Sequence, residues 1–146
     1  KLGADYTINV SEEDPLERIM EITGGIGVDV SLECTSGAGT IPVMLGVEAL
    51  KRKGGTILLQ GELAEFPNFP LGKATVKWIT FKSARGHGYR SCELALEQLA
   101  SHRFPLDLVT THTYPLEEAD TAVRAVAGEI SEDVVHVSLL PHGPVH

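Results

Sequence analysis

Two apolar stretches bounded by glycine pairs constrain the fold most strongly. The first, residues 24–37, alternates apolar and polar side chains between Val28 and Cys34, which is the period of a β-strand. The second, residues 54–61, is apolar almost throughout and predicts a buried strand over residues 56–60. A stretch of helical length separates them. Strands joined through a helix are typical of a parallel sheet, which binds ligands where its strands end.

The rest of the chain continues this alternation of strands and helices. Further strands are expected over residues 6–10, 78–84, 108–113 and 134–140. Helices are expected after the capping-box spacing at Ser11 with Pro15 in the first turn, from Thr40 and Pro42, from Ser91, and from Pro115. Residues 65–73 hold two prolines and a glycine and predict a loop. The order predicts an α/β fold with a mostly parallel sheet.

Composition narrows the class of protein. The 146 residues are one domain's worth and carry a net charge of −8. An acidic chain without a lysine or arginine cluster argues against binding to nucleic acid or to an anionic membrane. No apolar run reaches the length of a membrane span. Cys34 and Cys92 form no Cys-x-x-Cys pattern. Two such cysteines do not indicate a disulfide framework, and a reducing cytoplasm is the expected compartment.

Several short segments, taken in order, resemble one known family. They are Leu2-Gly3-Ala4-Asp5, Gly27-Val28-Asp29-Val30, Cys34-Thr35-Ser36, Gly54-Gly55 through Gly61, Phe81-Lys82-Ser83-Ala84-Arg85-Gly86, Thr111 through Ala119, and Val135 through Pro141. Each is weak alone, but their order and spacing resemble the medium-chain dehydrogenase/reductase superfamily, and within it the zinc-type alcohol dehydrogenases.

The resemblance implies a partial Rossmann fold. Family members carry a GroES-like catalytic domain and a Rossmann domain, and the end of their chain returns to the catalytic domain. Residues 1–88 then correspond to the second half of the NAD(P)-binding Rossmann domain, and residues 89–146 to helices and strands that partly belong to the catalytic domain. The chain begins at Lys1 and has no Gly-x-Gly-x-x-Gly turn that opens a helix. It is therefore expected to be a C-terminal fragment, inactive alone.

The resemblance also implies a cofactor, NAD or NADP, and a small alcohol or carbonyl substrate in the parent enzyme. Catalytic residues, the residue that selects NAD over NADP, and the zinc ligands are expected upstream, so no catalytic or metal-binding residue is assigned here. The strand over residues 78–84 corresponds to the edge through which family members pair into dimers, which implies a homo-oligomer.

Residues after the strands are the expected cofactor contacts. Cys34, Thr35 and Ser36 are placed beside the riboses, and Ser36 stands where many relatives have glycine. Gln60 is placed to accept from the nicotinamide carboxamide through its backbone carbonyl, and Gly61 to let the ring approach closely. Ala84 and Gly86 correspond to two further backbone contacts with that carboxamide. Cys34 and Gly61 also have plainer interpretations, as a small buried residue and as a turn.

His136 corresponds to a position where relatives often carry lysine or arginine against the pyrophosphate. A histidine there could donate a hydrogen bond, with a charge that depends on pH; a half-exposed strand histidine is the alternative. His87, His102 and His112 share no metal-ligand spacing, and His142 and His146 are four apart but lie in a tail rich in glycine and proline, so no metal site is assigned.

Two other functions remain open at this stage. One is a zinc-free quinone or enoyl reductase of the same superfamily, because the residues that discriminate the branches are expected upstream. The other is a non-catalytic binding or dimerisation module, because a half-domain with an uncovered sheet edge readily recruits another chain. Without the first βαβ unit, apolar surface on one side of the sheet is expected to be exposed, which predicts marginal stability or self-association.

Overall fold

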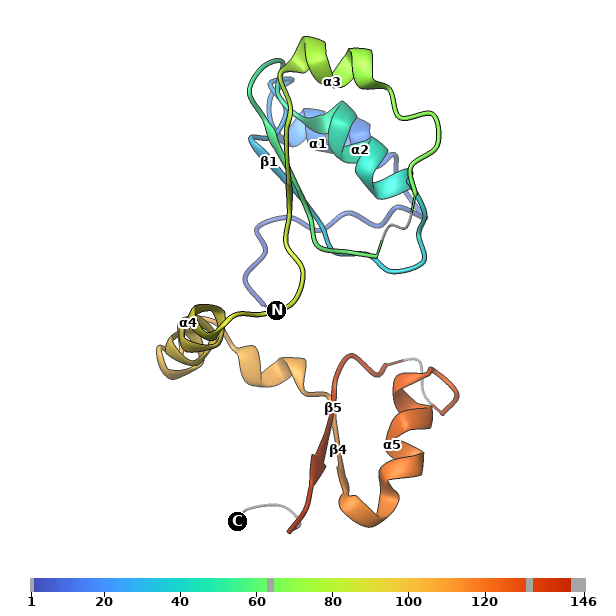
Figure 1. Cartoon of the computed structure of the whole chain (residues 1–146), viewed down its shortest axis with the longest axis vertical. Helices are drawn as coiled ribbons and strands as arrows, with labels where there is room; N and C mark the ends of the chain where they lie inside the picture. Colours follow the sequence, from blue (N-terminus) through green and yellow to red (C-terminus); the bar gives the residue numbers. More distant parts are fainter. Residues whose placement is uncertain (1, 63–64, 131–132, 143–146) are drawn as a thin grey trace. The chain divides into compact units, whose positions relative to one another are not determined.

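The computed structural model describes residues 2–62, 65–130 and 133–142. It contains two compact units, one formed by residues 6–86 and the other by residues 1–5 and 87–146. We call the first the sheet unit and the second the C-terminal unit. Figure 1 labels most of their helices and strands.

Three parallel strands form the centre of the sheet unit. They are β1 (Val30–Glu33), β2 (Thr56–Leu59) and β3 (Thr80–Ser83), hydrogen-bonded in the order β1-β2-β3. The register aligns Glu33 with Leu59 and Leu59 with Ser83, so all three strands end at the same level. The prediction of an α/β fold with parallel strands is confirmed, and so are the strands expected over residues 56–60 and 78–84, with slightly shorter bounds.

Two helices pack beside this sheet. Helix α1 (Pro15–Ile22) lies against α2 (Ile41–Ala49), and α2 packs on β1 and β2 (Figure 1). The core is Val47 and Leu50 against Ile57 of β2. Gly27 precedes β1 at a position where only glycine fits. Its φ is +85°, and a Cβ there would lie 2.6 Å from the Ala49 carbonyl oxygen.

The Lys77 side chain connects a third helix to the C-terminal end of α2 through hydrogen bonds. Helix α3 (Leu71–Lys77) ends with Trp78 in the left-handed conformation, at φ 54°. The Lys77 ammonium donates to the carbonyls of Val47, Glu48 and Leu50 at 2.7–2.8 Å. These carbonyls lie at the C-terminal end of α2, where positive charge is favoured. Burial lowers the pKa of the Lys77 ammonium.

The C-terminal unit is built on a two-stranded parallel ribbon. Helix α4 (Tyr89–Ala100) is followed by the 3₁₀ turn η1 (Leu106–Val109), strand β4 (His112–Pro115), the 3₁₀ turn η2 (Leu116–Glu118), helix α5 (Ala119–Val126) and strand β5 (Val137–Leu140). Strands β4 and β5 pair in parallel, and α5 packs beside them (Figure 1). The predicted strand over residues 134–140 is confirmed as β5.

Several sequence predictions are wrong in detail. Residues 6–10 form no strand, because in the described structure no neighbouring strand pairs with them. The predicted loop over residues 65–73 ends earlier, since α3 begins at Leu71 directly after Pro70. The strand expected over residues 108–113 starts at His112, because Pro105 begins the η1 turn.

Two helix caps also differ from the prediction. Asp14, not Ser11, caps α1: its carboxylate accepts from the backbone N–H of Glu17 at 2.8 Å. Gly88 precedes α4, and Ser91 lies inside that helix. Nowhere in the described ranges does a helix have the length and apolar character needed to cross a membrane.

Candidate functional site

The candidate site is the edge of the sheet unit where the three parallel strands end. Strand β1 is followed by Cys34, Thr35 and Ser36, β2 by Gln60 and Gly61, and β3 by Ala84 and Gly86. Because the strand ends are in register, the segments after them come together. This carboxyl edge is where open α/β sheets bind ligands.

Backbone hydrogen bonds hold the loops after β1 and β2 together. The N–H groups of Gln60 and Gly61 donate to the Glu33 carbonyl at 2.9 and 3.0 Å, and the Glu62 N–H donates to the Thr35 carbonyl at 3.1 Å. A further parallel bridge joins Ser36 to Glu62. The pairing of β1 with β2 therefore continues past the strands into the loops.

The loop after β3 is attached in the same way. The Ala84 N–H donates to the Leu59 carbonyl at 2.9 Å, so Ala84 continues the pairing of β3 with β2. Gly86, two residues later, has a φ of +71° and ends the unit. The side chain of Arg85 extends over this edge to Glu62, with 3.3 Å between Nη2 and Oε1.

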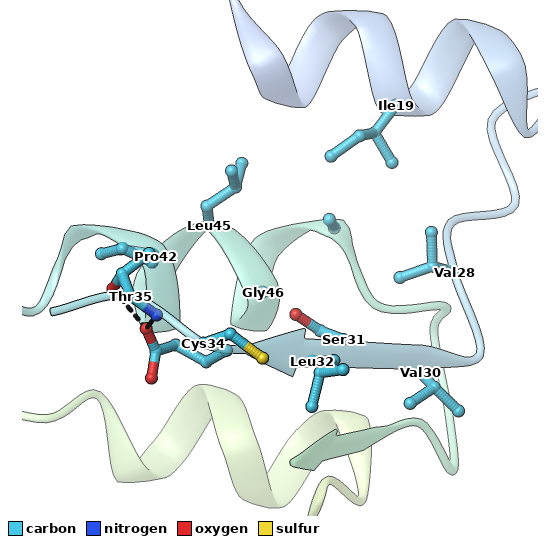
Figure 2. A pocket seen from close by; sticks show the side chains of 12 residues that line it. Ile19, Val28, Val30, Ser31, Leu32, Cys34, Thr35, Pro42, Leu45 and Gly46 are labelled. Carbon is cyan, nitrogen blue, oxygen red and sulfur yellow. Dashed lines mark hydrogen bonds between the residues drawn. The ribbon is translucent and has the colours of Figure 1, made fainter. Parts of the chain in front are cut away.

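A buried carboxylate lies directly beneath the edge. Glu33 is 6% exposed and is the one charged residue among those described that is buried. Its Oε1 accepts from the Thr35 backbone N–H at 2.7 Å and from the Thr35 hydroxyl, as the dashed lines at Thr35 in Figure 2 show. The Thr35 hydroxyl, the Thr35 N–H and the Gly61 N–H together lower the pKa of the Glu33 carboxyl against the opposing effect of burial.

Sequence reasoning missed Glu33 as a member of the site. The alternation within residues 28–34 placed it opposite the apolar side chains, where a charged residue is normally exposed. The usable signal was its position as the last residue of β1, followed by a threonine two residues later.

Gly61 is needed for the packing of this edge. A Cβ at this position would lie closer than 3.0 Å to the Glu33 carboxylate and to the Thr35 carbonyl oxygen. The absence of a side chain therefore lets the β2 loop press against the β1 loop. This supports the interpretation of Gly61 as a structural turn.

An apolar cavity of about 270 Å³ lies beside β1. Figure 2 shows it between α1, α2 and the strand, with Ile19, Val28, Leu45 and Pro42 around it. The neighbouring side chains of Val30 and Leu32 are 58% and 61% exposed. The cavity meets the candidate site at Glu33, Cys34 and Thr35, and its aliphatic walls offer few groups for a polar ligand.

The structure brings six of the predicted residues together and places a seventh close by. Cys34, Thr35, Ser36, Gln60 and Ala84 are exposed at the edge, and Gly61 is half-buried there. Gly86 follows on the same loop as Ala84.

His136 lies in the C-terminal unit, just before β5. Its Nδ1 is 3.3 Å from the Thr110 hydroxyl, and its carbonyl accepts from the N–H groups of Thr111 and His112 at 3.0 and 3.2 Å. Within the described ranges, no three His, Cys, Asp or Glu side chains gather where they could hold a metal ion.

Comparison with known proteins gives this fold a family. Residues 1–101 match the model of the family described as "Zinc-binding dehydrogenase". The chain therefore belongs to the zinc-binding dehydrogenase family, as the resemblance predicted.

Characterised relatives are polyol dehydrogenases. The chain is 32% identical over 135 residues to the sorbitol dehydrogenase of Mus musculus, covering 86% of this chain and 36% of that protein. It is 30% identical over 148 residues to the erythritol/L-threitol dehydrogenase of Mycolicibacterium smegmatis, covering 97% of this chain and 38% of that protein. The chain thus spans well under half the length of these relatives.

A solved structure agrees with the assignment. The alcohol dehydrogenase of Thermus sp. ATN1 superposes with a TM-score of 0.76 at 29% identity, covering 91% of this chain and 37% of that one. This chain is accordingly a domain of the zinc-type alcohol and polyol dehydrogenase family.

Proposed function

We propose that this chain forms the nicotinamide side of the cofactor cleft of an NAD(P)-dependent alcohol or polyol dehydrogenase. Residues 1–88 are the second half of its Rossmann domain, and residues 89–146 return to its catalytic domain. Membership of the family supports this assignment, and so do the sorbitol and erythritol dehydrogenases among its relatives.

One observation carries the proposal: three loops that the resemblance assigns to the cofactor are joined by hydrogen bonds at one edge of a parallel sheet. In this proposal Cys34, Thr35 and Ser36 face the riboses, and the exposed Ser36 hydroxyl donates to one of them. The Gln60 carbonyl and the backbone of Ala84 and Gly86 orient the carboxamide of the nicotinamide. His136 lies against the pyrophosphate.

The donor set fits a nicotinamide nucleotide. Hydroxyl groups and free backbone groups at an exposed edge match the ribose hydroxyls and the amide of such a ligand. When bound, the cofactor supplies the hydride chemistry with a small alcohol or carbonyl compound. This chain's residues bind and orient it.

The zinc of the proposed parent enzyme has no ligand set among the described residues. We therefore assign no step through zinc to this chain. Alone, the chain is expected to be catalytically inactive.

Cofactor binding is tested with NAD, NADP and the two mononucleotides that make up NAD. Backbone amide NMR of the chain is followed while nicotinamide mononucleotide, adenosine monophosphate, NAD or NADP is added. Nicotinamide mononucleotide and the full cofactors should shift the amides of Ser36, Gly61 and Ala84, whereas adenosine monophosphate should leave them in place. Equal shifts with both halves, or none with any nucleotide, would refute the proposal.

Inactivity is tested by absorbance at the reduced-nicotinamide band. The chain is incubated with sorbitol, erythritol or ethanol and either cofactor, with and without added zinc. No turnover is expected, because hydride transfer needs a substrate site that this chain is not proposed to hold. Measurable turnover with any alcohol would contradict this part of the proposal.

We also propose that β3 pairs two copies of the chain. All four residues of β3 are exposed, and within the described sheet its outer edge has no partner strand. Light scattering after size exclusion should show a dimer, and Phe81→Pro, which removes a backbone N–H from β3, should shift the population to monomer. A wild-type chain that stays monomeric at high concentration would exclude this assembly.

We assign the protein to the cytoplasm, because Cys34 and Cys92 are both free and exposed, which fits a reducing compartment.

A further inference from the structure

The buried carboxylate of Glu33 is stabilised by hydrogen bonds. A buried carboxylate is costly unless its charge is compensated, and no lysine, arginine or histidine in the described ranges forms an ion pair with it. Compensation comes instead from Thr35, through its N–H at 2.7 Å and its hydroxyl. The negative charge of Glu33 is therefore stabilised by hydrogen bonds from the loop that follows it.

This arrangement uses both hydrogen-bond donors of Thr35 within the protein. Its N–H and hydroxyl donate to Glu33, and its carbonyl accepts from the Glu62 N–H. The flanking Cys34 and Ser36 are exposed. Thr35 is exposed as well, so it anchors the β1 loop through its hydrogen bonds while the whole segment 34–36 faces outward.

The same carboxylate touches the loop after β2. Its second oxygen fills the space where a Cβ of Gly61 would lie, and the Gly61 N–H donates to the Glu33 carbonyl at 3.0 Å. One residue therefore contacts both loops, through its backbone and through its side chain.

We propose that Glu33 is a positioning residue whose buried carboxylate, acting through Thr35 and Gly61, fixes the β1 and β2 loops relative to each other. The consequence for cofactor binding rests on the proposed function: the ribose-facing Ser36 and the carboxamide-facing Gln60 stand on these two loops. Loss of the carboxylate would then separate groups that must meet one ligand.

Few other charges act on Glu33. The thiol of Cys34 follows it, Glu62 lies beyond Gly61 and is paired with Arg85, and Glu48 of α2 is paired with Lys73. From α2, the cavity shared with Glu33 is lined by Pro42, Leu45, Gly46 and Ala49, none of which titrates. The hydrogen bonds from Thr35 therefore have the largest effect on the pKa of the Glu33 carboxyl.

The positioning role is tested first on the wild-type chain, without nucleotide. Acid titration by NMR should move the amide resonances of Thr35 and Gly61 together, with one midpoint that lies below the ordinary pKa of a glutamate. The direction follows from the lowered pKa of the Glu33 carboxyl. Separate midpoints, or a Gly61 amide that does not respond, would overturn the proposal.

Variants test the link between the loops. In Glu33→Gln, hydrogen exchange of the Thr35 and Gly61 amides should become about tenfold faster, while the Ile57 amide keeps its protection. Glu48→Gln is the matched control, since it removes a carboxylate outside the edge and should leave both amides unchanged. If Glu33→Gln does not fold, Thr35→Val removes only the hydroxyl bond and should accelerate exchange at both amides to a smaller extent. Unchanged exchange at Gly61 would overturn the proposal.

The functional consequence has its own readout. If wild-type chain binds nicotinamide mononucleotide, Glu33→Gln should weaken that binding about tenfold and Glu48→Gln should not; equal binding would overturn the positioning role. If the wild-type chain binds no nucleotide, the proposed function fails, while the titration and exchange results still decide whether Glu33 joins the loops.

Discussion

The two compact units differ in what they bury. Of the eight buried apolar residues in the described chain, six belong to the sheet unit and two, Ala122 and Ala125, to the C-terminal unit. Helix α4 buries no residue at all, and Val123 and Val126 of α5 are 68% and 64% exposed. Because hydrophobic stabilisation scales with buried apolar area, the sheet unit carries most of the core, and the C-terminal unit leaves large apolar side chains exposed.

The largest expected effect tests this difference in the core. Ile57 is fully buried in β2, so Ile57→Ala should lower the free energy of unfolding by about 3 kcal/mol through lost burial and a cavity. Val123→Ala, at a position exposed in the C-terminal unit, should change it by less than about 0.5 kcal/mol. Urea unfolding followed by circular dichroism measures both. Comparable losses from the two variants would mean that the units do not differ as described.

A second test sharpens the comparison within the sheet unit. Gly61→Ala forces a methyl group against Glu33 and Thr35 and should cost about 2 kcal/mol. Gly72→Ala is the matched control, because a Cβ there meets nothing within 4 Å and alanine favours helix α3, which should stabilise the unit by about 0.5 kcal/mol. Thermal unfolding of the two variants should shift in opposite directions. If Gly61→Ala does not lower the unfolding temperature, the edge is not tightly packed at Gly61.

The sequence predicted the parallel strands well because their signals are local. Residues 56–60 form an apolar run between glycines, and β2 lies where that run indicated. The failures have different physical causes. Residues 6–10 have strand-like composition, but a strand exists only where another backbone pairs with it. Helix α3 was missed because the two prolines and the glycine of residues 65–73 suggest a loop, whereas Pro70 is the N-cap residue at which that loop ends.

The candidate site was predictable in position and not in mechanism. The resemblance named the loops after each strand, and register brings those of the sheet unit to one edge. The role of Glu33 depends on which face of β1 the helix α2 covers, and the alternation of residues 28–34 does not determine that face. Ser31 packs against Gly46 of α2, so Glu33, two residues later, is buried on the same side, while Val30 and Leu32 are exposed.

A third test concerns the cap that Lys77 provides. Lys77→Met removes three charge-assisted hydrogen bonds from the last carbonyls of α2 and should cost about 1.5 kcal/mol. The control is Lys73→Met, which breaks an ion pair with Glu48 at a side chain that is 47% exposed and should cost less than about 0.5 kcal/mol. Urea midpoints of the two variants give the comparison. Equal losses would show that Lys77 acts as an ordinary surface charge.

The smallest expected effect concerns two exposed ion pairs, one in each unit. The sheet unit pairs Arg85 with Glu62 at 3.3 Å, with side chains 81% and 70% exposed, and the C-terminal unit pairs Arg124 with Glu129 at 2.9 Å, both 55% exposed. Double-mutant cycles with alanine should give coupling energies below about 0.5 kcal/mol for both pairs, because solvent screens exposed charges. Raising the salt concentration should reduce both values further. If the C-terminal pair instead coupled by more than about 1 kcal/mol, ionic contacts would partly replace the apolar core that this unit lacks, and the contrast between the units would be one of kind rather than of amount.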